Sequence, residues 1–299
     1  MKRKLLYIVN PISGTGNKSS LREIIEVKTR AEGIEFAIYP SVESGDYGFL
    51  LAIVREQNFT EVIVAGGDGT INHVVGTLGK LKIQFGIIPC GSGNGLAFTA
   101  GIPKNPEKAL QIIFKGKTKW CDAFLVNERF ACMLCGLGFD AKVAHDFAND
   151  PKRGLNTYIR KTVVNFFTAR TYPFILNTNG RKLKTDALFI SIANSNQFGN
   201  HFTIAPKASL NDGLLDVVVM AEQNKLFALL QAFRQAGGYN KLQKLEVINE
   251  NASVLYFQTS ELRIENPALA PMHIDGDPVE TQQTVNVQIL KDFFRLTSP

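Results

Sequence analysis

The chain has 299 residues, a formal net charge of +6 and 45% hydrophobic residues. This length exceeds the usual ~100 to 200 residues of one domain, so we expect two domains with substantial cores. The basic balance suits anionic partners such as nucleotides or acidic lipid surfaces, although a mild excess of this size also serves solubility alone. No stretch approaches the ~18 apolar residues of a membrane-spanning helix, so any membrane contact is expected to be peripheral.

The opening residues MKRKLLYIVN carry three basic side chains before a short apolar run. That run is too short for the hydrophobic region of a signal peptide and ends at Asn10-Pro11, so a β-strand is expected there. Four cysteines in apolar surroundings, Cys90, Cys121, Cys132 and Cys135, fit reduced thiols better than a disulfide framework. The sequence therefore indicates a cytoplasmic protein. Cys132 and Cys135 form a CxxC pair, but a structural zinc would need two more ligands at matching spacing.

Strand and helix patterns alternate in the part of the chain before Lys117. Such alternation implies a parallel sheet that is covered by helices on both faces. Strands are predicted at 4–9, 34–40, 61–65 and 84–89. Helices are predicted at 19–31, 45–56 and 71–78, in a short segment after Asn94, and between a capping Asn105 and a terminating Gly116.

Beyond Lys117 the pattern changes to period-two runs separated by turn signals. Asn179-Gly180, for example, marks a hairpin. This part of the chain is therefore predicted to be an antiparallel β domain. Helical insertions are expected at roughly 139 to 170 and 224 to 237.

Three of the predicted parallel strands end in glycine-rich polar turns that open helices. Ligands bind at the carboxyl ends of such strands, where glycines allow backbone N–H groups to approach an anion closely. Three converging turns suggest a polyphosphate. Their residues are Asn10-Pro11-Ile12-Ser13-Gly14, Gly66-Gly67-Asp68-Gly69-Thr70 and Gly91-Ser92-Gly93-Asn94.

Asp68 is the unusual member, because a carboxylate repels phosphates unless a divalent cation lies between them or a proton must be accepted. This points to phosphoryl transfer. The alternative is a tight turn in which Asp68 lies near a helix N-terminus and Thr70 is the cap. Neither a Walker A loop nor the G-x-G-x-x-G fingerprint occurs in the sequence.

Five motifs, NPISG, GGDGT, GIIPCGSGN, DGLLD and HIDGD, occur in an order that resembles the diacylglycerol kinase catalytic domain family. That family includes bacterial lipid kinases and sphingosine kinases, and NAD kinases are more distant members. The resemblance implies a three-layer α/β nucleotide-binding domain, at 1–120 plus about 285–299. It also implies a β-sandwich lipid-substrate domain at 121–284, and transfer of the γ-phosphate of ATP to a lipid hydroxyl.

The resemblance also implies roles for individual residues. Asp68 and Asp122 are expected in or near a catalytic Mg²⁺ network, Asp275 as the general base, and Asp277 as a residue that orients nucleotide or metal. If the stretch at Gly276 is extended, Asp275 and Asp277 project to the same side. The alternative for Asp275 is an aspartate in a β-turn. The expected ATP contacts are Asn10, Ser13, Gly66, Gly67, Gly69, Thr70, Gly91, Ser92, Gly93 and Asn94.

The segment NDGLLDVVV suggests a structural Mg²⁺ held by Asp212 and Asp216, since carboxylates and backbone carbonyls are ligands that hard cations prefer. The alternative is a turn that is capped by Asp212 before a strand. The sequence departs from the common bacterial pattern at His73 and Asp277, where Glu is usual, and at Gly95, where Asp is frequent. A small residue at position 95 is closer to sphingosine kinases, so the metal network and the acceptor lipid are left open.

Residues 139 to 170 combine basic and aromatic side chains in a composition that could lie on an anionic bilayer. An ordinary pair of amphipathic helices packed on the β domain is the alternative. The residues concerned are Lys152, Arg153, Arg160, Lys161, Arg170, Phe147, Tyr158, Phe166 and Phe167.

The sequence thus predicts an ATP- and Mg²⁺-dependent lipid kinase, peripheral at the membrane, with diacylglycerol as the first acceptor. Three alternatives stay open: a kinase of sphingoid bases or another lipid, a kinase of a soluble substrate such as NAD, and a non-catalytic nucleotide-binding regulatory protein. No nucleic-acid partner is expected, and a homodimer is left open.

Overall fold

The computed structural model describes residues 2–10, 18–81, 83–148, 161–162, 165–166, 168–199, 202–222 and 224–299. The chain forms two compact units. The first contains residues 1–121 and 292–299, and the second contains residues 122–291. Two strands, β5 (Thr118–Val126) and β17 (Thr284–Thr297), hold residues of both units.

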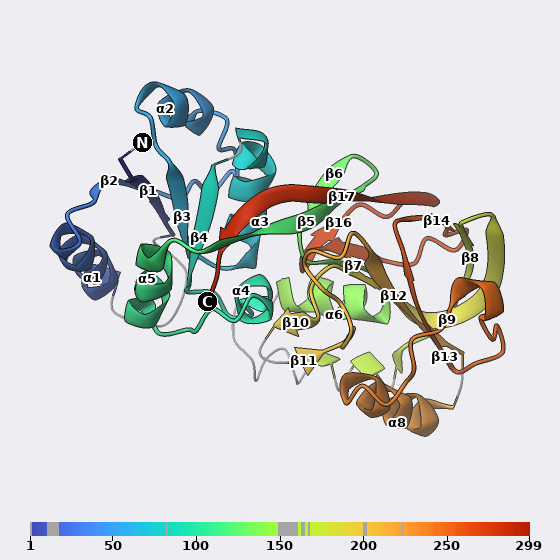
Figure 1. Ribbon diagram of the computed structural model, residues 1–299. Helices are drawn as coiled ribbons and strands as arrows, with labels where there is room; N and C mark the ends of the chain where they lie inside the picture. The colour runs from blue at the N-terminus through green and yellow to red at the C-terminus, as the bar shows by residue number, and fades with distance from the viewer. Residues whose placement is uncertain are drawn as a thin grey trace. The chain divides into compact units, whose positions relative to one another are not determined.

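The first unit is built on a parallel β-sheet with the strand order β2-β1-β3-β4-β17 (Figure 1). Its central strand β3 is buried at every residue, and β1 and β4 are buried except at their ends, which is typical of a parallel sheet covered on both faces. Each of the four predicted strands is present, with ends that agree within one residue. They are β1 (Lys4–Val9), β2 (Glu35–Pro40), β3 (Glu61–Gly66) and β4 (Gln84–Pro89).

Helices cover both faces of this sheet, with α1 and α5 on one side and α2 and α3 on the other (Figure 1). Asn105 caps α5 by accepting the N–H of Lys108, and Gly116 ends it in the left-handed region at φ 68°, as predicted. The bounds are α1 (Lys18–Ala31), α2 (Leu50–Glu56), α3 (Asp68–Leu78), the short 3-10 turn η1 (Gly79–Leu81), α4 (Gly95–Thr99) and α5 (Pro106–Lys115).

Two helix starts differ from the prediction. The helix expected from Gly45 begins only at Leu50, because Gly45 has φ 71° and Asp46 accepts the N–H of Gly48 in a local turn. The helix expected from Ile71 begins three residues earlier, at Asp68. Gly67 is its N-cap residue and Thr70 lies inside its first turn, so the interpretation of Thr70 as the cap was wrong.

The second unit is an antiparallel β structure, and with the first unit it confirms the predicted fold class. The hairpin predicted at Asn179-Gly180 joins β8 to β9, with both residues at positive φ. The strands are β6 (Arg129–Ala131), β7 (Leu134–Gly138), β8 (Tyr172–Thr178), β9 (Arg181–Ala193), β10 (Gln197–Gly199), β11 (Phe202–Thr203), β12 (Leu215–Ala221), β13 (Val254–Thr259), β14 (Glu261–Glu265), β15 (Met272–Ile274) and β16 (Asp277–Val279).

Strand β9 organises this unit because its two halves have different neighbours. Its first half pairs with β8, while residues 189–193 pair with β7 on one side and with β12 on the other. Apolar side chains from most of the strands meet in one buried core. The end of β9 therefore lies between the starts of β7 and β12, where the polar residues described below gather.

Helices α6 (Phe139–Ala148) and α8 (Lys225–Ala236) and the 3-10 turn η2 (Leu245–Val247) complete the second unit. The helix predicted at 224–237 is thus present, and α6 is the first part of the insertion predicted at 139–170. Within the described residues, no helix has the length and apolar character needed to cross a membrane.

Candidate functional site

The described parts of the three glycine-rich turns come together at the carboxyl ends of β1, β3 and β4. These strands are neighbours in the sheet, and their last residues are in register, with Val9 opposite Ala65 and Gly66 opposite Pro89. Asn10 joins the first turn to the second, because its Nδ2 donates to Thr70 Oγ1 at 3.1 Å. Ser13 lies outside the described residues.

The second and third turns touch through their backbones. A Cβ on Gly67 would lie 3.1 Å from Gly91 Cα, and a Cβ on Gly91 would lie only 2.6 Å from Gly67 Cα. Gly67 has an extended backbone that any residue can adopt, so close approach and not conformation requires glycine there. Gly66 is restricted in the same way, since its Cβ would meet the Thr70 side chain at 3.0 Å.

Asp68 occupies the first turn of α3, where the positive end of the helix dipole favours a carboxylate. Its two oxygens accept the N–H groups of Gly95 and Leu96 at 3.2 and 3.4 Å. The side chain is half-buried and bonds to the start of α4, directly after the third turn. One carboxylate thus links the second and third turns.

Asn94 secures the third turn internally. It is buried, adopts the left-handed conformation at φ 55°, and uses its side-chain amide to bond both the N–H and the carbonyl of Gly91 at 2.8 Å. Ser92 is exposed and Gly93 is half-buried. The predicted ATP contact of Asn94 stays a prediction, and its side chain already holds the loop in shape.

In the second unit, Asp122 is tied to the NDGLLD segment. Its side chain is almost fully buried, Oδ2 accepts the N–H of Gly213 at 2.7 Å, and its own N–H donates to the carbonyl of Leu210. Burial raises the pKa of Asp212, and the charge of Asp122 acts in the same direction. The two predicted metal positions of this unit are therefore close neighbours.

Asp216 lies at the start of β12 and is completely buried. Tyr256 Oη donates to one of its oxygens and Gln258 Nε2 to the other, and Gln258 also reaches Asp212 at 3.4 Å. Burial raises the pKa of Asp216 to about 6. Among the described residues, no three His, Cys, Asp or Glu side chains are arranged to hold a metal ion.

Asp275 lies in the two-residue turn between β15 and β16. It has φ 49° and Gly276 has φ 89°, so the stretch is a tight hairpin turn, which agrees with the β-turn alternative for Asp275 and not with an extended segment. Asp-Gly is a strong signal for such a turn. Asp277 begins β16 and is exposed to solvent, whereas Asp275 is buried. The two side chains therefore lie in different environments.

The Asp275 carboxylate accepts three consecutive backbone N–H groups, those of Cys132, Met133 and Leu134, at 2.8 to 3.0 Å. Cys132 Sγ also lies 3.5 Å from Oδ2. These residues lead into β7. The side chain therefore fixes the bend before β7, which explains why an anionic residue is buried in this position.

Asn194 was missed in the sequence and belongs to the same polar cluster. It follows β9, is fully buried, and donates to the carbonyls of Asp122 and Cys132 at 2.9 and 3.0 Å. It thereby connects the Asp122 strand to the Asp275 bend. The signal that could have found it is the polar Asn-Ser pair that directly follows the apolar run of β9.

A buried pair of Asp140 and His273 adjoins this bend. Asp140 Oδ2 lies 3.6 Å from His273 Nε2, and Gly136 is close enough that a Cβ there would overlap both atoms. Burial raises the pKa of the Asp140 carboxyl, although the bond and charge of His273 oppose that rise. His273 Nδ1 accepts the N–H of Gly276 at 3.3 Å, which links the pair to the hairpin.

The predicted bilayer segment is described only in part. Phe139 in α6 packs edge-on against Phe166, with ring centroids 5.7 Å apart. Lys161 and Arg170 are described as well. Outside the described residues lie Lys152, Arg153, Tyr158, Arg160, Phe167 and the side chain of Phe147.

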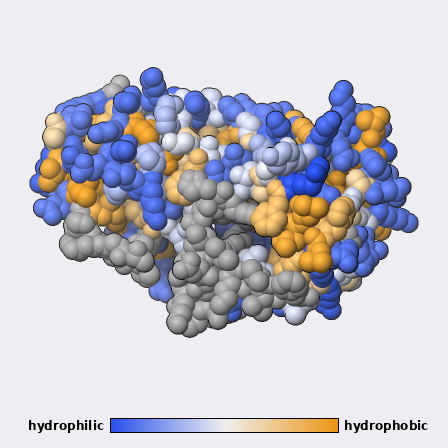
Figure 2. Space-filling view, turned by 90° about the horizontal axis from the view of Figure 1, so that it is seen from below, coloured by the Kyte–Doolittle hydropathy of each residue, from blue (hydrophilic) through white to orange (hydrophobic). Residues whose placement is uncertain are grey.

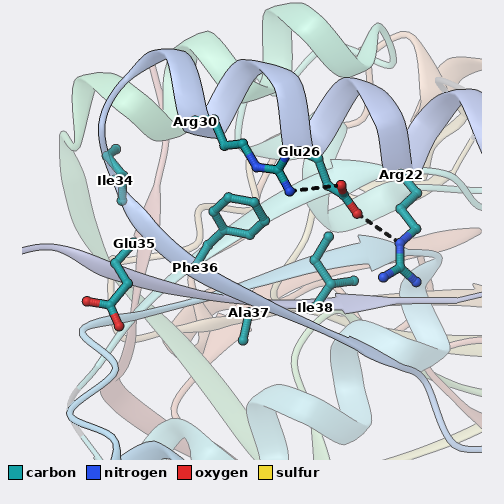
Figure 3. A pocket seen from close by; sticks show the side chains of 8 residues that line it. All are labelled: Arg22, Glu26, Arg30, Ile34, Glu35, Phe36, Ala37 and Ile38. Carbon is teal, nitrogen blue, oxygen red and sulfur yellow. Dashed lines mark hydrogen bonds and ion pairs between the residues drawn. The ribbon is translucent and has the colours of Figure 1, made fainter.

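A surface pocket of about 330 Å³ lies between α1 and β2 (Figure 3). Glu26 binds both Arg22 and Arg30 in it, at 3.0 and 3.3 Å, as neighbours one helical turn apart. None of the predicted site residues lines this pocket. Its lining consists of Arg22, Glu26, Arg30, Ile34, Glu35, Phe36, Ala37 and Ile38.

Comparison with known proteins gives matches over almost the whole chain. The model of the diacylglycerol kinase catalytic domain matches residues 4–126. The model of the YegS C-terminal NAD kinase beta sandwich-like domain matches residues 134–291. A probable lipid kinase YegS-like of Alcanivorax borkumensis is 24% identical over 307 residues, which cover 100% of this chain and 98% of that protein. A protein of the same name from Citrobacter koseri is 28% identical, with 96% and 94% covered.

Solved structures resemble the fold over the same length. The crystal structure of a diacylglycerol kinase from Bacillus anthracis str. Sterne has a TM-score of 0.75 and 22% identity, and covers 99% of this chain and 97% of its own. Another structure from that organism reaches a TM-score of 0.80 at 22% identity. The YegS C-terminal model matches more than half of the chain, and the two models together match most of it. The chain therefore belongs to the diacylglycerol kinase family and carries the YegS type of C-terminal domain.

Proposed function

We propose that this protein is an ATP-dependent lipid kinase that transfers the γ-phosphate of ATP to the hydroxyl of diacylglycerol. The observation that carries the proposal is the gathering of glycine-rich turns around Asp68 at the carboxyl ends of β1, β3 and β4. The family membership and the relatives named as probable lipid kinases support the same reading.

The turns fit a polyphosphate because their glycines have no side chains that would block access to the backbone. At Gly67 and Gly91 the two turns already touch, so a side chain on either would separate them or fill the approach to the backbone. Backbone N–H groups at the start of α3 add the partial positive charge of a helix N-terminus. We propose this edge of the sheet as the ATP-binding part of the first unit, residues 1–121 with 292–299.

The chemistry requires that the lipid oxygen attacks the γ-phosphorus, that the bond to the ADP oxygen breaks, and that the hydroxyl proton is taken up. Mg²⁺, when bound, would neutralise charge on the phosphates, and carboxylate oxygens such as those of Asp68 are suitable ligands. Asp68 is well suited to hold the metal or to receive the proton because it is half-buried and lies among the turns.

Asp275 was expected to be the general base, and that assignment stays a proposal beside the one for Asp68. The geometry favours Asp68, since its two bonds from backbone N–H groups are long, at 3.2 and 3.4 Å, and the side chain is half-buried. The buried Asp275 accepts three shorter bonds, at 2.8 to 3.0 Å, inside the second unit. We propose for Asp275 a positioning role at the bend before β7. The roles proposed for Asp122, Asp212 and Asp216 at Mg²⁺, and for Asp277 at the nucleotide, depend on the same test of metal and ATP dependence.

A second acceptor class, the sphingoid bases, is favoured by one observation. Gly95 stands where diacylglycerol kinases often have Asp, and its N–H donates to Asp68 at 3.2 Å. The first turn of α4 thus offers a donor to Asp68 without adding a second carboxylate beside it.

The test is a phosphorylation assay with γ-labelled ATP and a panel of acceptors, namely diacylglycerol, sphingosine and NAD, with and without Mg²⁺. We expect labelled phosphatidic acid from diacylglycerol and none after chelation. Labelled sphingosine phosphate as the main product would show that the acceptor is a sphingoid base and not diacylglycerol. Labelled NADP, or no product although ATP binds, would overturn the lipid kinase assignment in favour of the soluble-substrate kinase or the regulatory protein.

A further inference from the structure

Helix α8 presents large apolar side chains to solvent. Leu226, Leu230 and Phe233 are 73%, 53% and 68% exposed, and their spacing of four and three residues places them in one row along the helix. Phe227 and Leu229 flank this row and are also exposed. A soluble amphipathic helix normally turns such a stripe toward the core.

The face of α8 opposite this row is the one that packs against the second unit. Its buried residues are Ala228 and Gln235, a small and a polar side chain. Gln235 Nε2 donates to the carbonyl of Ile204 at 2.9 Å, which anchors this face to the unit. The apolar stripe therefore contributes little to the stability of the fold, and its exposure needs another explanation.

The segment after α8 also carries exposed apolar side chains. Tyr239, Leu242 and Val247 are exposed, and Val247 belongs to η2. Figure 2 views the molecule from the side on which α8 lies in Figure 1, and a continuous orange area is visible on the second unit. We call the exposed apolar side chains of residues 226–247 the α8 surface; they are Leu226, Phe227, Leu229, Leu230, Phe233, Tyr239, Leu242 and Val247.

The same stretch is basic. Residues 224–247 contain Lys225, Arg234, Lys241 and Lys244 against the single acidic residue Glu246, so four positive charges less one negative charge give +3. The net charge of the whole chain is +6. Arg234, Lys241 and Lys244 are exposed and thus available to an anionic partner.

Exposed Leu and Phe side chains bordered by Lys and Arg are the composition of a helix that lies in the interface of an anionic bilayer. We propose that the α8 surface docks the protein on a membrane that contains anionic lipid, with Leu226, Leu230 and Phe233 entering the boundary between head groups and acyl chains. The inference rests on the proposed function in one respect: an enzyme acting on a lipid acceptor must reach it at such a surface.

A neighbouring contact agrees with this placement. Lys225, the first residue of α8, donates to the carbonyl of Ala169, and its ammonium group lies 5.7 Å from the centre of the Phe166 ring. The end of the segment whose composition suggests bilayer contact thus adjoins the start of α8. Lys225 is partly buried and already bonded, whereas Arg234, Lys241 and Lys244 are exposed and carry the attraction to anionic lipid.

A second copy of the chain fits the α8 surface less well. A two-fold interface brings each patch against the same patch of the other subunit, so Arg234, Lys241 and Lys244 of both copies would approach one another. Like charges in contact oppose association, whereas an anionic bilayer compensates them. The charge of the α8 surface therefore favours the membrane.

The test measures partition of the purified full chain onto vesicles by sedimentation, without ATP or Mg²⁺. The vesicles consist of phosphatidylcholine alone or mixed with phosphatidylglycerol. We expect binding to the mixed vesicles, and we expect the double variant Leu226→Glu/Phe233→Glu to lower the partition coefficient at least about tenfold, because two carboxylates replace apolar side chains in the interface. The matched control is Val27→Glu on α1, an apolar residue that is 57% exposed and far from α8 in sequence; it should bind as the parent does.

The charge is tested separately with Lys241→Gln and Lys244→Gln. Each is expected to weaken binding to the mixed vesicles about fivefold, and added salt should reduce binding of the parent. Phosphatidylcholine vesicles should bind the parent much less. Circular dichroism melts of all variants verify that they are folded.

Equal binding of the parent and the Leu226→Glu/Phe233→Glu variant would overturn the inference, as would failure of the parent to bind mixed vesicles. Light scattering could instead show that the parent is a dimer and that the double variant is a monomer. If the parent also fails to bind vesicles, the α8 surface would be assigned to contact with a second copy. The outcome is separate from that of the proposed function, because vesicle binding needs no turnover. Conversely, phosphorylation of diacylglycerol dispersed in detergent micelles should be unaffected by the α8 variants.

Discussion

Two aspartates, one in each unit, illustrate opposite uses of a carboxylate. Asp68 is half-buried in the first turn of α3 and accepts two N–H groups at 3.2 and 3.4 Å from the next turn. Asp275 is 6% exposed and accepts three N–H groups of one bend at 2.8 to 3.0 Å. Long bonds at a surface can be exchanged for bonds to a ligand at small cost, whereas short bonds in the interior cannot.

The difference shows that a carboxylate in a family motif can have either a catalytic or a structural role, and that the motif alone does not tell which. Both residues stand in motifs, GGDGT and HIDGD, for which the family resemblance of the sequence implied catalytic roles. Their surroundings predict that loss of Asp68 changes the reaction and that loss of Asp275 changes the fold. Each of the following experiments tests one side of that contrast.

The largest effect is expected for Asp68→Asn. If this carboxylate holds the metal or takes the proton, kcat should fall by about 10² to 10⁴ while the melting temperature stays near that of the parent. Steady-state assays at saturating ATP and diacylglycerol measure the first quantity. Asp46→Asn is the matched control, since Asp46 is exposed and its replacement amide oxygen can still accept the N–H of Gly48. A parent-like kcat in Asp68→Asn would remove this residue from the reaction.

Next in size is the loss of stability in Asp275→Ala. The change leaves three backbone N–H groups buried without their acceptor, so the free energy of unfolding should fall by about 3 kcal/mol or more. Urea denaturation measures it, and Asp186→Asn on the exposed side of β9 serves as the control.

Asp275→Asn separates the two roles that were considered for this residue. A base would give a variant of parental stability with a kcat lowered by about 10² or more. A positioning residue would give a less stable variant, because an amide group replaces an oxygen that accepts an N–H. A folded, fully stable and inactive Asp275→Asn would restore Asp275 as the general base.

A smaller effect is expected where the glycine-rich turns touch. In Gly91→Ala the new methyl group would lie 2.6 Å from Gly67 Cα, so the two turns must move apart. We expect the Kd for ATP to rise about tenfold, which corresponds to about 1.4 kcal/mol. Calorimetry measures the affinity. Gly48→Ala is the control because its methyl group would meet only the exposed side chain of Asp46. Unchanged ATP affinity in Gly91→Ala would place the nucleotide elsewhere.

The smallest effect concerns pH and Asp140. Burial raises the pKa of this carboxyl above its ordinary value of 3.8, so the folded protein holds the proton more tightly than the unfolded chain does. The contribution to stability is fully present below about pH 4 and is lost as the pH rises through the higher pKa of the folded state. Asp140→Asn should flatten this part of the curve of unfolding free energy against pH. An unchanged slope would show that Asp140 does not carry it.

More of the structure of the first unit than of the second could be predicted from the sequence. Around Asp68 the strands, the turns and the helices follow one another locally, so the pattern alone placed Asn10, Gly67 and Gly91 at one edge of a sheet. The register of β1, β3 and β4 then brought them together as expected.

The second unit depends on contacts between residues far apart in the chain. Asp122 bonds to Gly213, and Asp275 bonds to Cys132, across separations that no local pattern encodes. The Asp275-Gly276 turn did have a local signal, and a β-turn aspartate was one of the two interpretations that the sequence allowed for Asp275. Helix α8 was predicted at nearly its observed bounds, but the side on which it packs depends on Gln235 and Ile204, a tertiary contact.

The return of β17 to the first unit has a consequence for biosynthesis. Arg295 and Leu296 pair with the edge strand β4, and Phe294 is buried edge-on against Phe85, with ring centroids 6.0 Å apart. While the polypeptide emerges from the ribosome, the sheet of the first unit stays one strand short until the whole second unit has been translated. An unpaired strand edge invites association with other chains, so the nascent first unit is the stage at which a chaperone would matter most.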